Sequence, residues 1–554
     1  MINKKRMFVG LTAALGLVLA ACGANDDAST PGANNEGGAS SYAELDADGR
    51  FYETRTISVA LWDRGNDRVP NFDESYWAEW VAQTFYEERN VQIEWVPVSR
   101  WEESNQQSTM LGAQNAPDIG YTFSNPMIET MADMGGIINL HPLLQEYREL
   151  LPNLFETLGE EIIYWNFNPE RETLYSLTGR NMQHGRVNTF IREDWLNALD
   201  LPVPTTLEEF EAALIAFRDN ADVLNNGEVT PFFLTGDAMW DSQPLVESFI
   251  PSDVSEREWF VRDFDDRRFM HEDAAREATR VLNRWFNEGL IWNDFVIAEA
   301  TVGHDMIRQG QVGAFMQNWD MPYRAGDGWT TQMRQNVGED ANFIPVTPFL
   351  NDQGEVQKFF PNPTDRFIFM PTTNQEPLAS LLYLDFITRP DVVEFLQFGV
   401  EGVHRETQAD GGIVVLAESD DHVWPDNQVI PSANNFDITM TVNGIASIDV
   451  LQNAYPGIAP EQILAARAAG MDHARWFRPV TTRPIDSQSG MDEPLRDFRN
   501  QMVQRLIANT SIENFDAEWD REYQLYLNLG AADIMAEREA AWVEAFGDVS
   551  TQPE

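Results

Sequence analysis

The feature that most constrains the fold is a regular succession of strands and helices that begins near Arg55. Its apolar residues alternate with period two in some stretches and recur at helical spacing in others. The expected elements are strand 55–61, helix 73–89, strand 91–95, helix 101–114 and strand 116–123. This order predicts an α/β fold whose three strands are parallel and joined by right-handed crossovers. Ligands of such sheets bind beyond the carboxyl ends of the strands, where residues 62–66 and 124–126 fall.

A targeting segment precedes this pattern. Basic residues 4–6 are followed by an apolar run over residues 7–19 that is too short to span a bilayer comfortably. These features predict a secretory signal peptide over residues 1–21. Leu19-Ala20-Ala21-Cys22 resembles the lipobox of bacterial lipoproteins, and Cys22 is the only cysteine, so it has no internal disulfide partner. The resemblance implies a lipid on Cys22 and a protein anchored on the extracytoplasmic face of the cell membrane. The alternative is an ordinary signal peptide followed by a chance cysteine.

Composition bounds what the rest of the chain can do. Apart from Pro31, residues 23–41 contain no apolar side chain larger than alanine, and we expect a flexible tether over residues 22–50. The remainder is long enough for two or three domains, and its 17 tryptophans help to form a large core. The 38 Lys and Arg against 89 Asp and Glu give a net charge of −51. This charge argues strongly against nucleic acid as a partner and also against a polybasic membrane patch, and it favours a solvated acidic surface.

Several segments of the chain resemble a known family. Ser108-Thr109-Met110-Leu111-Gly112-Ala113 is followed by Ala116-Pro117-Asp118-Ile119. Together with the lipobox and a first strand that ends in tryptophan, these segments look like extracellular solute-binding protein family 1. Later segments that resemble the family in the same order are 136–140, 187–196, 199–210, 310–319, 366–371 and 398–404. The resemblance spans nearly all of residues 54–545 and depends on the number and order of its motifs.

The resemblance implies a two-lobed α/β fold of the periplasmic-binding-protein type II, with discontinuous lobes and a hinge. The N-terminal lobe would comprise residues 54–180 plus 342–397, and the C-terminal lobe residues 181–341 plus 398–545. The implied function is capture of an oligosaccharide between the lobes and its delivery to the permease subunits of an ABC transporter. Lobe closure would follow from a ligand that touches both lobes and so favours the closed state. We expect a monomer without a cofactor.

One of these segments also carries an independent helix signal. Thr205 and Glu208 fit a capping box after Pro204. Apolar residues then recur on one helix face as far as Phe217. The sequence therefore predicts a helix that is capped by Thr205.

Candidate ligand-binding residues follow from the chemistry of sugars. A pyranose offers a flat C–H face to aromatic rings and hydroxyls to charged or amide groups. The predicted ligand-binding residues, which lie beside polar or turn residues or at the expected strand ends, are Trp62, Asp63, Arg64, Asn125, Trp240, Trp319, Asp320, Tyr323, Arg366, His404 and Trp424. For each one a core, solvated or hinge role is the alternative. The tryptophans in helical patterns, which we assign to packing, are Trp77, Trp80, Trp285, Trp519 and Trp542.

Catalytic and metal-binding signatures are absent from the sequence. It contains no HExxH, GxSxG or phosphate-binding loop motif. The 89 acidic residues guarantee that some carboxylates lie close together, so carboxylate pairs are uninformative. Residues 219–228 correspond to a calcium loop of longer family members, but Leu224 stands where an oxygen ligand is needed if Asp222 is position one. We expect no enzyme activity, no catalytic residues and no metal site.

Other functions remain open at this stage. A tethered glycosidase or lyase would share the acidic surface and the aromatic residues. Within the binding class, a peptide or a uronic-acid oligomer is an alternative to a neutral sugar. A uronate binder would need converging cations such as Arg64 or Arg366. The net acidity favours a neutral oligosaccharide.

Overall fold

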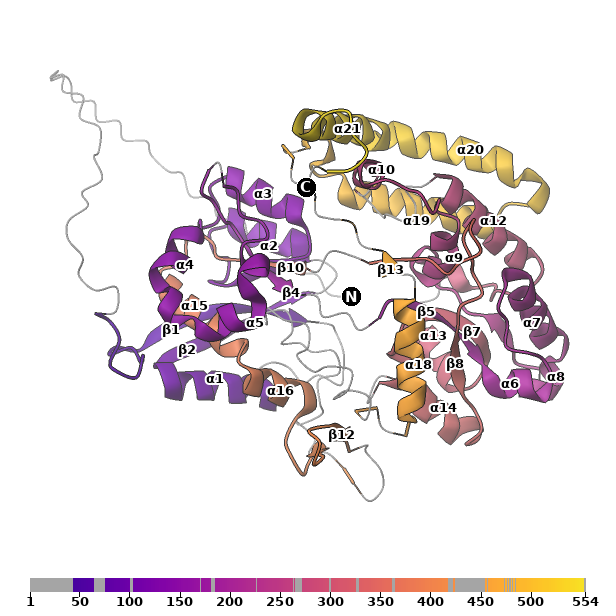
Figure 1. The fold of residues 1–554 in the computed structure, drawn as a ribbon, viewed down its shortest axis with the longest axis horizontal. Coiled ribbons are helices and arrows are strands. Elements are labelled where there is room, and N and C mark those ends of the chain that lie inside the picture. The colour runs from indigo at the N-terminus through magenta and orange to yellow at the C-terminus, as the bar shows by residue number, and fades with distance from the viewer. Residues whose placement is uncertain are drawn as a thin grey trace, which may run out of the picture. The chain divides into compact units, whose positions relative to one another are not determined.

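The computed structural model describes residues 43–63, 75–99, 103–169, 171–180, 185–225, 227–262, 264, 272–297, 300–324, 328–360, 364–416, 422–423, 454–455, 457–472, 474–475, 477, 480, 482–483 and 485–552. Met1–Ala43 is separate from the unit Glu44–Glu554, to which the described strands and helices belong. The strands and helices of this unit form two groups, each built around its own main sheet (Figure 1).

The first sheet has the strand order β2-β1-β3-β10-β4. Its strands are β1 (Arg55–Asp63), β2 (Val91–Ser99), β3 (Gly120–Thr122), β4 (Leu177–Arg180) and β10 (Thr364–Phe369). β1 and β2 are parallel, and a parallel bridge between Val59 and Ile119 joins β1 to the start of β3. β10 is antiparallel to both β3 and β4. The predicted parallel arrangement of the first three strands is confirmed.

Helices pack around this sheet. They are α1 (Tyr76–Arg89), α2 (Glu103–Gly112), α3 (Asn125–Asp133), α4 (His141–Tyr147), η2 (Arg148–Leu150), α5 (Pro152–Ile163), α15 (Pro377–Ile387) and α16 (Pro390–Phe398). In α1, the Ser75 side chain accepts a hydrogen bond from Ala78 N, and the helix ends at Asn90 in the left-handed conformation. Trp77 and Phe85 of this helix are buried in the core, as predicted for Trp77.

The second sheet has the strand order β6-β7-β5-β8. Its strands are β5 (Val187–Arg192), β6 (Thr230–Phe232), β7 (Val312–Asn318) and β8 (Phe343–Val346). β6 is parallel to β7, whereas β5 is antiparallel to both of its neighbours. A short parallel pair, β9 (Lys358–Phe359) with β13 (Ala474–Arg475), belongs to the same group because Phe359 stacks on Trp259 with ring centroids 4.6 Å apart.

The helices of the second group pack on this sheet and on one another. They are α6 (Glu193–Ala198), α7 (Leu207–Asp219), α8 (Ala221–Asn225), η3 (Trp240–Ser242), α9 (Gln243–Ser248), α10 (Glu256–Arg262), α12 (Glu272–Asn287), η4 (Phe295–Ile297), α13 (Ala300–Arg308), η5 (Met321–Tyr323), α14 (Thr330–Val337), α18 (Pro460–Met471), η6 (Asp486–Gln488), α19 (Asp492–Ala508), η7 (Ile512–Asn514), α20 (Phe515–Tyr526), η8 (Leu527–Ala531) and α21 (Ala532–Phe546). Trp285, Trp519 and Trp542 are fully buried among them, as predicted. Trp80 of α1 is half-buried against Phe395, with ring centroids 4.1 Å apart.

Two segments group differently from the boundaries that the sequence suggested. Residues 342–360 were assigned to the N-terminal lobe, but β8 pairs with β5 along its whole length in the second sheet. Residues from 398 were assigned to the C-terminal lobe, but the hairpin β11 (Arg405–Thr407) and β12 (Ile413–Val415) follows His404, whose ring packs 5.5 Å from Trp77 of α1. Pairing and packing therefore place 343–360 with the second group and 398–415 with the first.

The first group begins within the segment that was predicted to be a tether, residues 22–50. Leu45 and Phe51 form a backbone bridge, and both side chains are buried in the core of the first group. Asn90 anchors this turn because its amide donates to Phe51 O at 3.0 Å. The tether predicted over residues 22–50 is therefore wrong for its last residues, where two apolar side chains find a core to bury in.

The predicted cap of α7 is displaced by one residue. Thr206, not Thr205, is the N-cap, and its hydroxyl accepts from Glu209 N at 3.3 Å. The Glu209 carboxylate in turn accepts from Thr205 N at 2.8 Å. Two consecutive threonines, each followed by a glutamate three residues later, offer two overlapping capping boxes.

Candidate functional site

The predicted residues Trp319 and Asp320 lie at the end of β7. Asn318, the last residue of β7, pairs with Val187, the first residue of β5, so Trp319 follows at the edge where the chain enters the second sheet. Trp319 is 7% exposed and meets the ring of Tyr455 edge-on, with centroids 6.2 Å apart. Asp320 follows Trp319 and is the N-cap of the short 3-10 helix η5.

Asp320 is the centre of a small polar network. Arg324 donates to both carboxylate oxygens of Asp320, at 2.8 and 3.1 Å. The Tyr455 hydroxyl donates to Asp320 Oδ2 at 3.4 Å, and burial together with the nearby carboxylate raises the pKa of Tyr455. An aromatic pair beside a bidentate ion pair combines a flat apolar face with fixed donors and acceptors, which is the chemistry a sugar ring requires.

Two glycines let the chain pack closely around Trp319. A Cβ on Gly185 would lie 2.7 Å from Trp319 Cγ, and a Cβ on Gly470 would lie 3.2 Å from Trp319 Cβ. Any larger residue at Gly185 would have to move the indole. The position of the indole is therefore set by the backbone at Gly185, just before β5, and at Gly470 in α18.

Three other predicted residues are buried. Tyr323 is fully buried, its hydroxyl donates to Phe343 O at 2.9 Å, and burial raises its pKa. Arg366 of β10 is also buried, against Gly179 of β4. His404 is buried as well, and its Nδ1 accepts from Val400 N at 2.9 Å. Tyr323 and His404 therefore form hydrogen bonds within their own groups of elements.

The remaining predictions lie apart from the Trp319 network or outside the described side chains. Trp240 begins η3, where it is half-buried against the core of the second group. Asn125 begins α3 and donates to Glu129 at 3.1 Å. Trp62 and Asp63 end β1, but their side chains lie outside the described part of the structure, as do Arg64 and Trp424 altogether.

Sequence reasoning missed two members of the Trp319 network and a buried lysine. Arg324 could have been found, because it stands four residues after Asp320, a spacing at which opposite charges can pair. Tyr455 could not, because 130 residues or more separate it from its partner along the chain. Lys358 could have been noticed from the composition, because it is the only lysine after residue 5.

Lys358 is fully enclosed in the second group. Its ammonium donates to Val187 O and to Asn188 Oδ1, both at 2.8 Å. Burial lowers the pKa of Lys358 to about 7; the Glu247 carboxylate opposes this shift and the Arg186 guanidinium adds to it. The side chain thus ties β9 to the first residues of β5.

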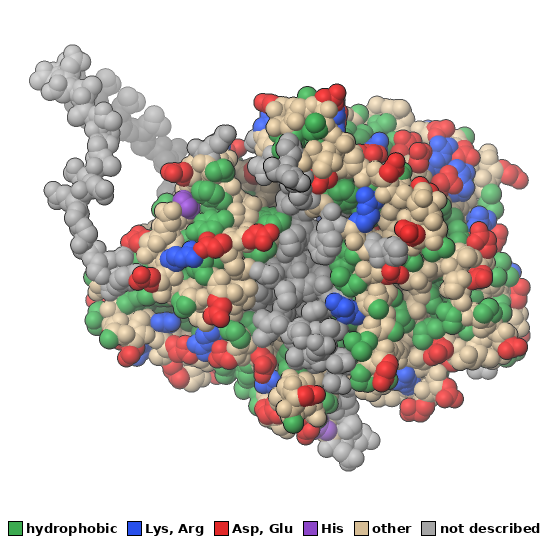
Figure 2. All heavy atoms as spheres, in the orientation of Figure 1, with side chains coloured by type: hydrophobic (Ala, Val, Ile, Leu, Met, Phe, Trp, Pro, Cys, Tyr) green, Lys and Arg blue, Asp and Glu red, His purple; other side chains and the backbone are tan. Residues whose placement is uncertain are grey.

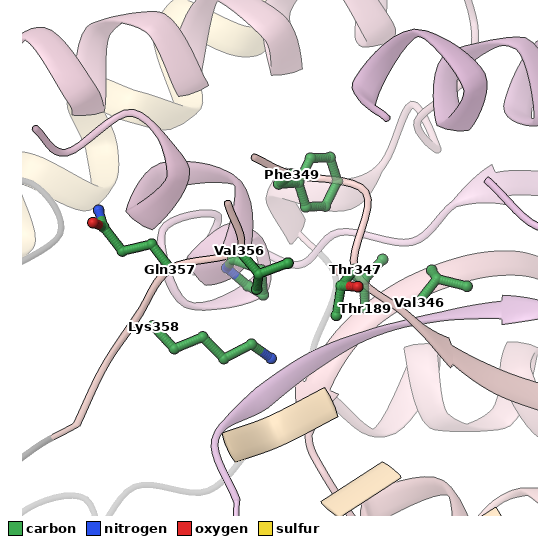
Figure 3. A pocket seen from close by; sticks show the side chains of 8 residues that line it. Thr189, Val346, Thr347, Phe349, Val356, Gln357 and Lys358 are labelled. Atoms are coloured by element: carbon green, nitrogen blue, oxygen red, sulfur yellow. The ribbon is translucent and has the colours of Figure 1, made fainter. Parts of the chain in front are cut away.

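A cavity borders this lysine, and it is far too small for a sugar (Figure 3). Lys358 approaches it from β9 and Thr189 from β5, with Val346 and Phe349 on the side of β8. Its volume of about 10 Å³ is that of a single water molecule. We therefore do not place an oligosaccharide there.

On the face drawn in Figure 2, Asp and Glu side chains are spread over the surface and not gathered into one patch. Among the residues that the structure describes, no group of three or more His, Cys, Asp or Glu side chains is arranged to hold a metal ion. Within the same described ranges, the helices include none with the length and apolar character needed to cross a bilayer.

Comparisons with known proteins agree with this architecture. No protein-family model matches the chain. It is 22% identical over 373 residues to the polygalacturonan/rhamnogalacturonan-binding protein YtcQ of Bacillus subtilis, covering 65% of this chain and 68% of that protein. It is 26% identical over 318 residues to the fructooligosaccharide ABC transporter substrate-binding protein FusA of Streptococcus pneumoniae, covering 53% of this chain and 54% of that one. The chain thus spans about half the length of FusA.

A solved structure shows the fold. The alginate-binding protein AlgQ2, crystallised without calcium ion, superposes with a TM-score of 0.66 over 90% of this chain and 99% of that chain, at 16% sequence identity. The two groups of elements are therefore the two lobes of a fold like that of the periplasmic binding proteins, the first group the N-terminal lobe and the second the C-terminal lobe. The predicted fold class is confirmed.

Proposed function

We propose that this chain is the substrate-binding protein of an ABC-type importer and that it captures an oligosaccharide between its two lobes. The observation that carries the proposal is the network of Trp319, Tyr455, Asp320 and Arg324 at the edge of the second sheet. It combines aromatic faces with a fixed ion pair in a chain whose fold and relatives are those of sugar-binding proteins. The captured sugar would then be passed to the permease subunits of the transporter.

The names of the related proteins support a sugar ligand, but they differ in whether that sugar is charged. YtcQ and AlgQ2 are named for binding polymers of acidic sugars, and FusA for a neutral fructooligosaccharide. Of the cations beside the Trp319 network, Arg324 already pairs with Asp320. A net-neutral pair suits neutral hydroxyls, and we therefore keep a neutral oligosaccharide as the first candidate and a uronic-acid oligomer as the second.

A thermal-shift screen tests the proposal. The chain from residue 42 would be mixed separately with kestose, an oligogalacturonide and an alginate oligomer, and each mixture would be assayed afterwards for breakdown of the sugar. A ligand at one hundred times its dissociation constant adds about 2.7 kcal/mol to the free energy of unfolding, which raises the melting temperature measurably. A shift with the sugar intact supports a binding protein. Breakdown of the sugar would instead indicate a tethered glycosidase or lyase. An unchanged melting temperature with all three sugars would refute an oligosaccharide of these classes as the ligand.

The membrane attachment is part of the same proposal. Cys22 would carry the lipid, residues 1–21 would be removed, and the monomeric protein would stay on the extracytoplasmic face of the membrane. The support is the sequence around Cys22. The residues between Cys22 and Glu44 would form the tether, because the buried turn at Leu45 already belongs to the N-terminal lobe.

A further inference from the structure

Polar side chains gather where the first strands of the N-terminal lobe end. β2 ends at Ser99 and β3 at Thr122. Two hydrogen bonds tie the first turns of α2 to these ends: Ser99 N donates to Gln106 Oε1 at 3.0 Å, and Phe123 N donates to Glu103 Oε1 at 3.4 Å. In folds built on parallel strands, this edge of the sheet is where ligands bind.

The same edge carries two of the residues predicted to bind ligand. The register of the parallel pair places Trp62 beside Val98 and Asp63 beside Ser99. Since Ser99 is bonded to α2, the first turns of α2 lie next to the end of β1.

Gln107 of α2 is unusual. Its side chain is 0% exposed, yet neither its Oε1 nor its Nε2 has a hydrogen-bond partner within the described part of the chain. Gln107 follows Glu103 by one helical turn, so the two side chains lie on the same face of α2. A buried amide that makes no hydrogen bond is costly, and in native proteins such a group calls for a specific explanation.

The polar groups around Glu103 are partly paired with one another. Glu103 Oε1 accepts from the Ser104 hydroxyl at 3.0 Å, and Thr122 Oγ1 accepts from Ser124 N at 3.1 Å. The contact of Thr122 Oγ1 with Glu103 Oε1 is longer, at 3.5 Å, which is beyond the usual range for hydrogen bonds between oxygens. The unpaired amide of Gln107 therefore lies one helical turn from a carboxylate whose Oε1 is already hydrogen-bonded and which keeps a second oxygen.

We propose that Gln107 and Glu103 form a sugar-binding subsite of the N-terminal lobe. The amide of Gln107 offers an acceptor and two donors, and the Glu103 carboxylate offers acceptors, so the pair matches two neighbouring hydroxyls of a sugar. Ligand binding would supply the partners that Gln107 lacks. This inference rests on the proposed function, and a water molecule on Gln107 is the competing occupant.

The test replaces Gln107 by an apolar side chain of similar size in the full-length chain, purified in detergent. In Q107L, removal of the unpaired amide should leave the melting temperature of the ligand-free protein unchanged or raise it. The same change should weaken binding of the sugar that the wild type binds most tightly, among kestose, an oligogalacturonide and an alginate oligomer. Loss of two hydrogen bonds to uncharged groups corresponds to about a 10- to 100-fold higher dissociation constant.

Matched variants make the outcome decisive. Gln83 is an exposed glutamine on α1, bonded only to Glu87 among described residues, and Q83L should bind sugar as the wild type does. Unchanged affinity in Q107L overturns the subsite, and a lower melting temperature with unchanged affinity identifies a structural water instead. If Q107L does not fold, the same affinity comparison with Q107E decides, since that variant keeps the size but loses both donors. A wild type that binds none of the sugars overturns the proposed function itself, so the two failures are distinguishable.

Discussion

Replacing the buried lysine should change how stability depends on pH. Lys358 lies enclosed beside Val187 and Asn188, and burial lowers its pKa from 10.5 to about 7. Between pH 7 and pH 10.5 the unfolded chain therefore binds more protons than the folded protein. The free energy of unfolding must then rise with pH in this window, and the gain is absent below it, where both states are protonated.

The size of the effect follows from the two pKa values. Integrating the difference in bound protons for a single group gives about 2 kcal/mol between pH 7 and pH 9. In K358M no proton is exchanged at this position, so its stability profile should lack this rise. The change also leaves two acceptors, Val187 O and Asn188 Oδ1, without the ammonium. That loss shifts the whole curve, so the prediction concerns the difference in slope and not the absolute stability.

Denaturation by urea from pH 7 to pH 9, followed by tryptophan fluorescence, measures the two profiles side by side. Subtracting the K358M curve removes the contribution of the acidic surface, which is common to both proteins. The chain offers an independent check because Lys4, Lys5 and Lys358 are its only lysines. In protein labelled with ¹³C at lysine Cε, the resonance missing from K358M should titrate near pH 7. Parallel stability curves, or titration of that resonance near pH 10.5, would refute the reasoning.

Three further changes test the site, the fold and the anchor. W319F keeps an aromatic ring but loses most of the indole face beside Tyr455, so oligosaccharide affinity measured by calorimetry should fall about tenfold, while a wild-type affinity would remove Trp319 from the site. N90A should lower the free energy of unfolding by about 2 kcal/mol, because it removes the hydrogen bond to Phe51 O and forces a non-glycine residue to keep a φ of 59° without its side-chain support. N90G should lose less, since glycine adopts that φ freely, and equal losses in urea denaturation would contradict this account. A radioactive fatty acid supplied to growing cells should label the wild type but not C22A, and labelling of C22A to the wild-type level would exclude the lipid on this residue.

Local patterns allowed much of the N-terminal lobe to be predicted. The period-two alternation from Arg55 and the helical spacing around Trp77 are properties of short segments, and both elements form where they were expected. The lobe membership of Phe343–Val346 could not be predicted in this way. That segment belongs to the C-terminal lobe because it pairs antiparallel with β5, whose residues lie about 150 positions earlier in the chain. The sequence of the segment itself does not indicate which strand it pairs with.

The candidate site shows the same division. Trp319 and Asp320 were found because an indole beside an acidic residue at a strand end is visible in the sequence, and the structure places both in one network. Tyr323 has a similar sequence neighbourhood and is buried in the same core cluster as Trp319, yet its hydroxyl donates to Phe343 O and not to the Trp319 network. Which partner a turn residue meets depends on what packs against it, and this information is distributed over distant segments.

The unpaired amide of Gln107 gives the proposed closure a physical source of energy. In the ligand-free protein, the burial of an unbonded amide is a cost that the fold bears. A ligand that supplies its partners recovers this cost as well as gaining its own hydrogen bonds, whereas the paired Asp320 and Arg324 have less to recover. A ligand shifts a conformational equilibrium only by its differential affinity for the two states. Gln107 is 0% exposed, so a sugar pairs with it only if closure of the lobes also uncovers the amide. Such a sugar would favour the closed state more than one held by the Trp319 network alone, and Q107L should reduce compaction in small-angle scattering at saturating sugar.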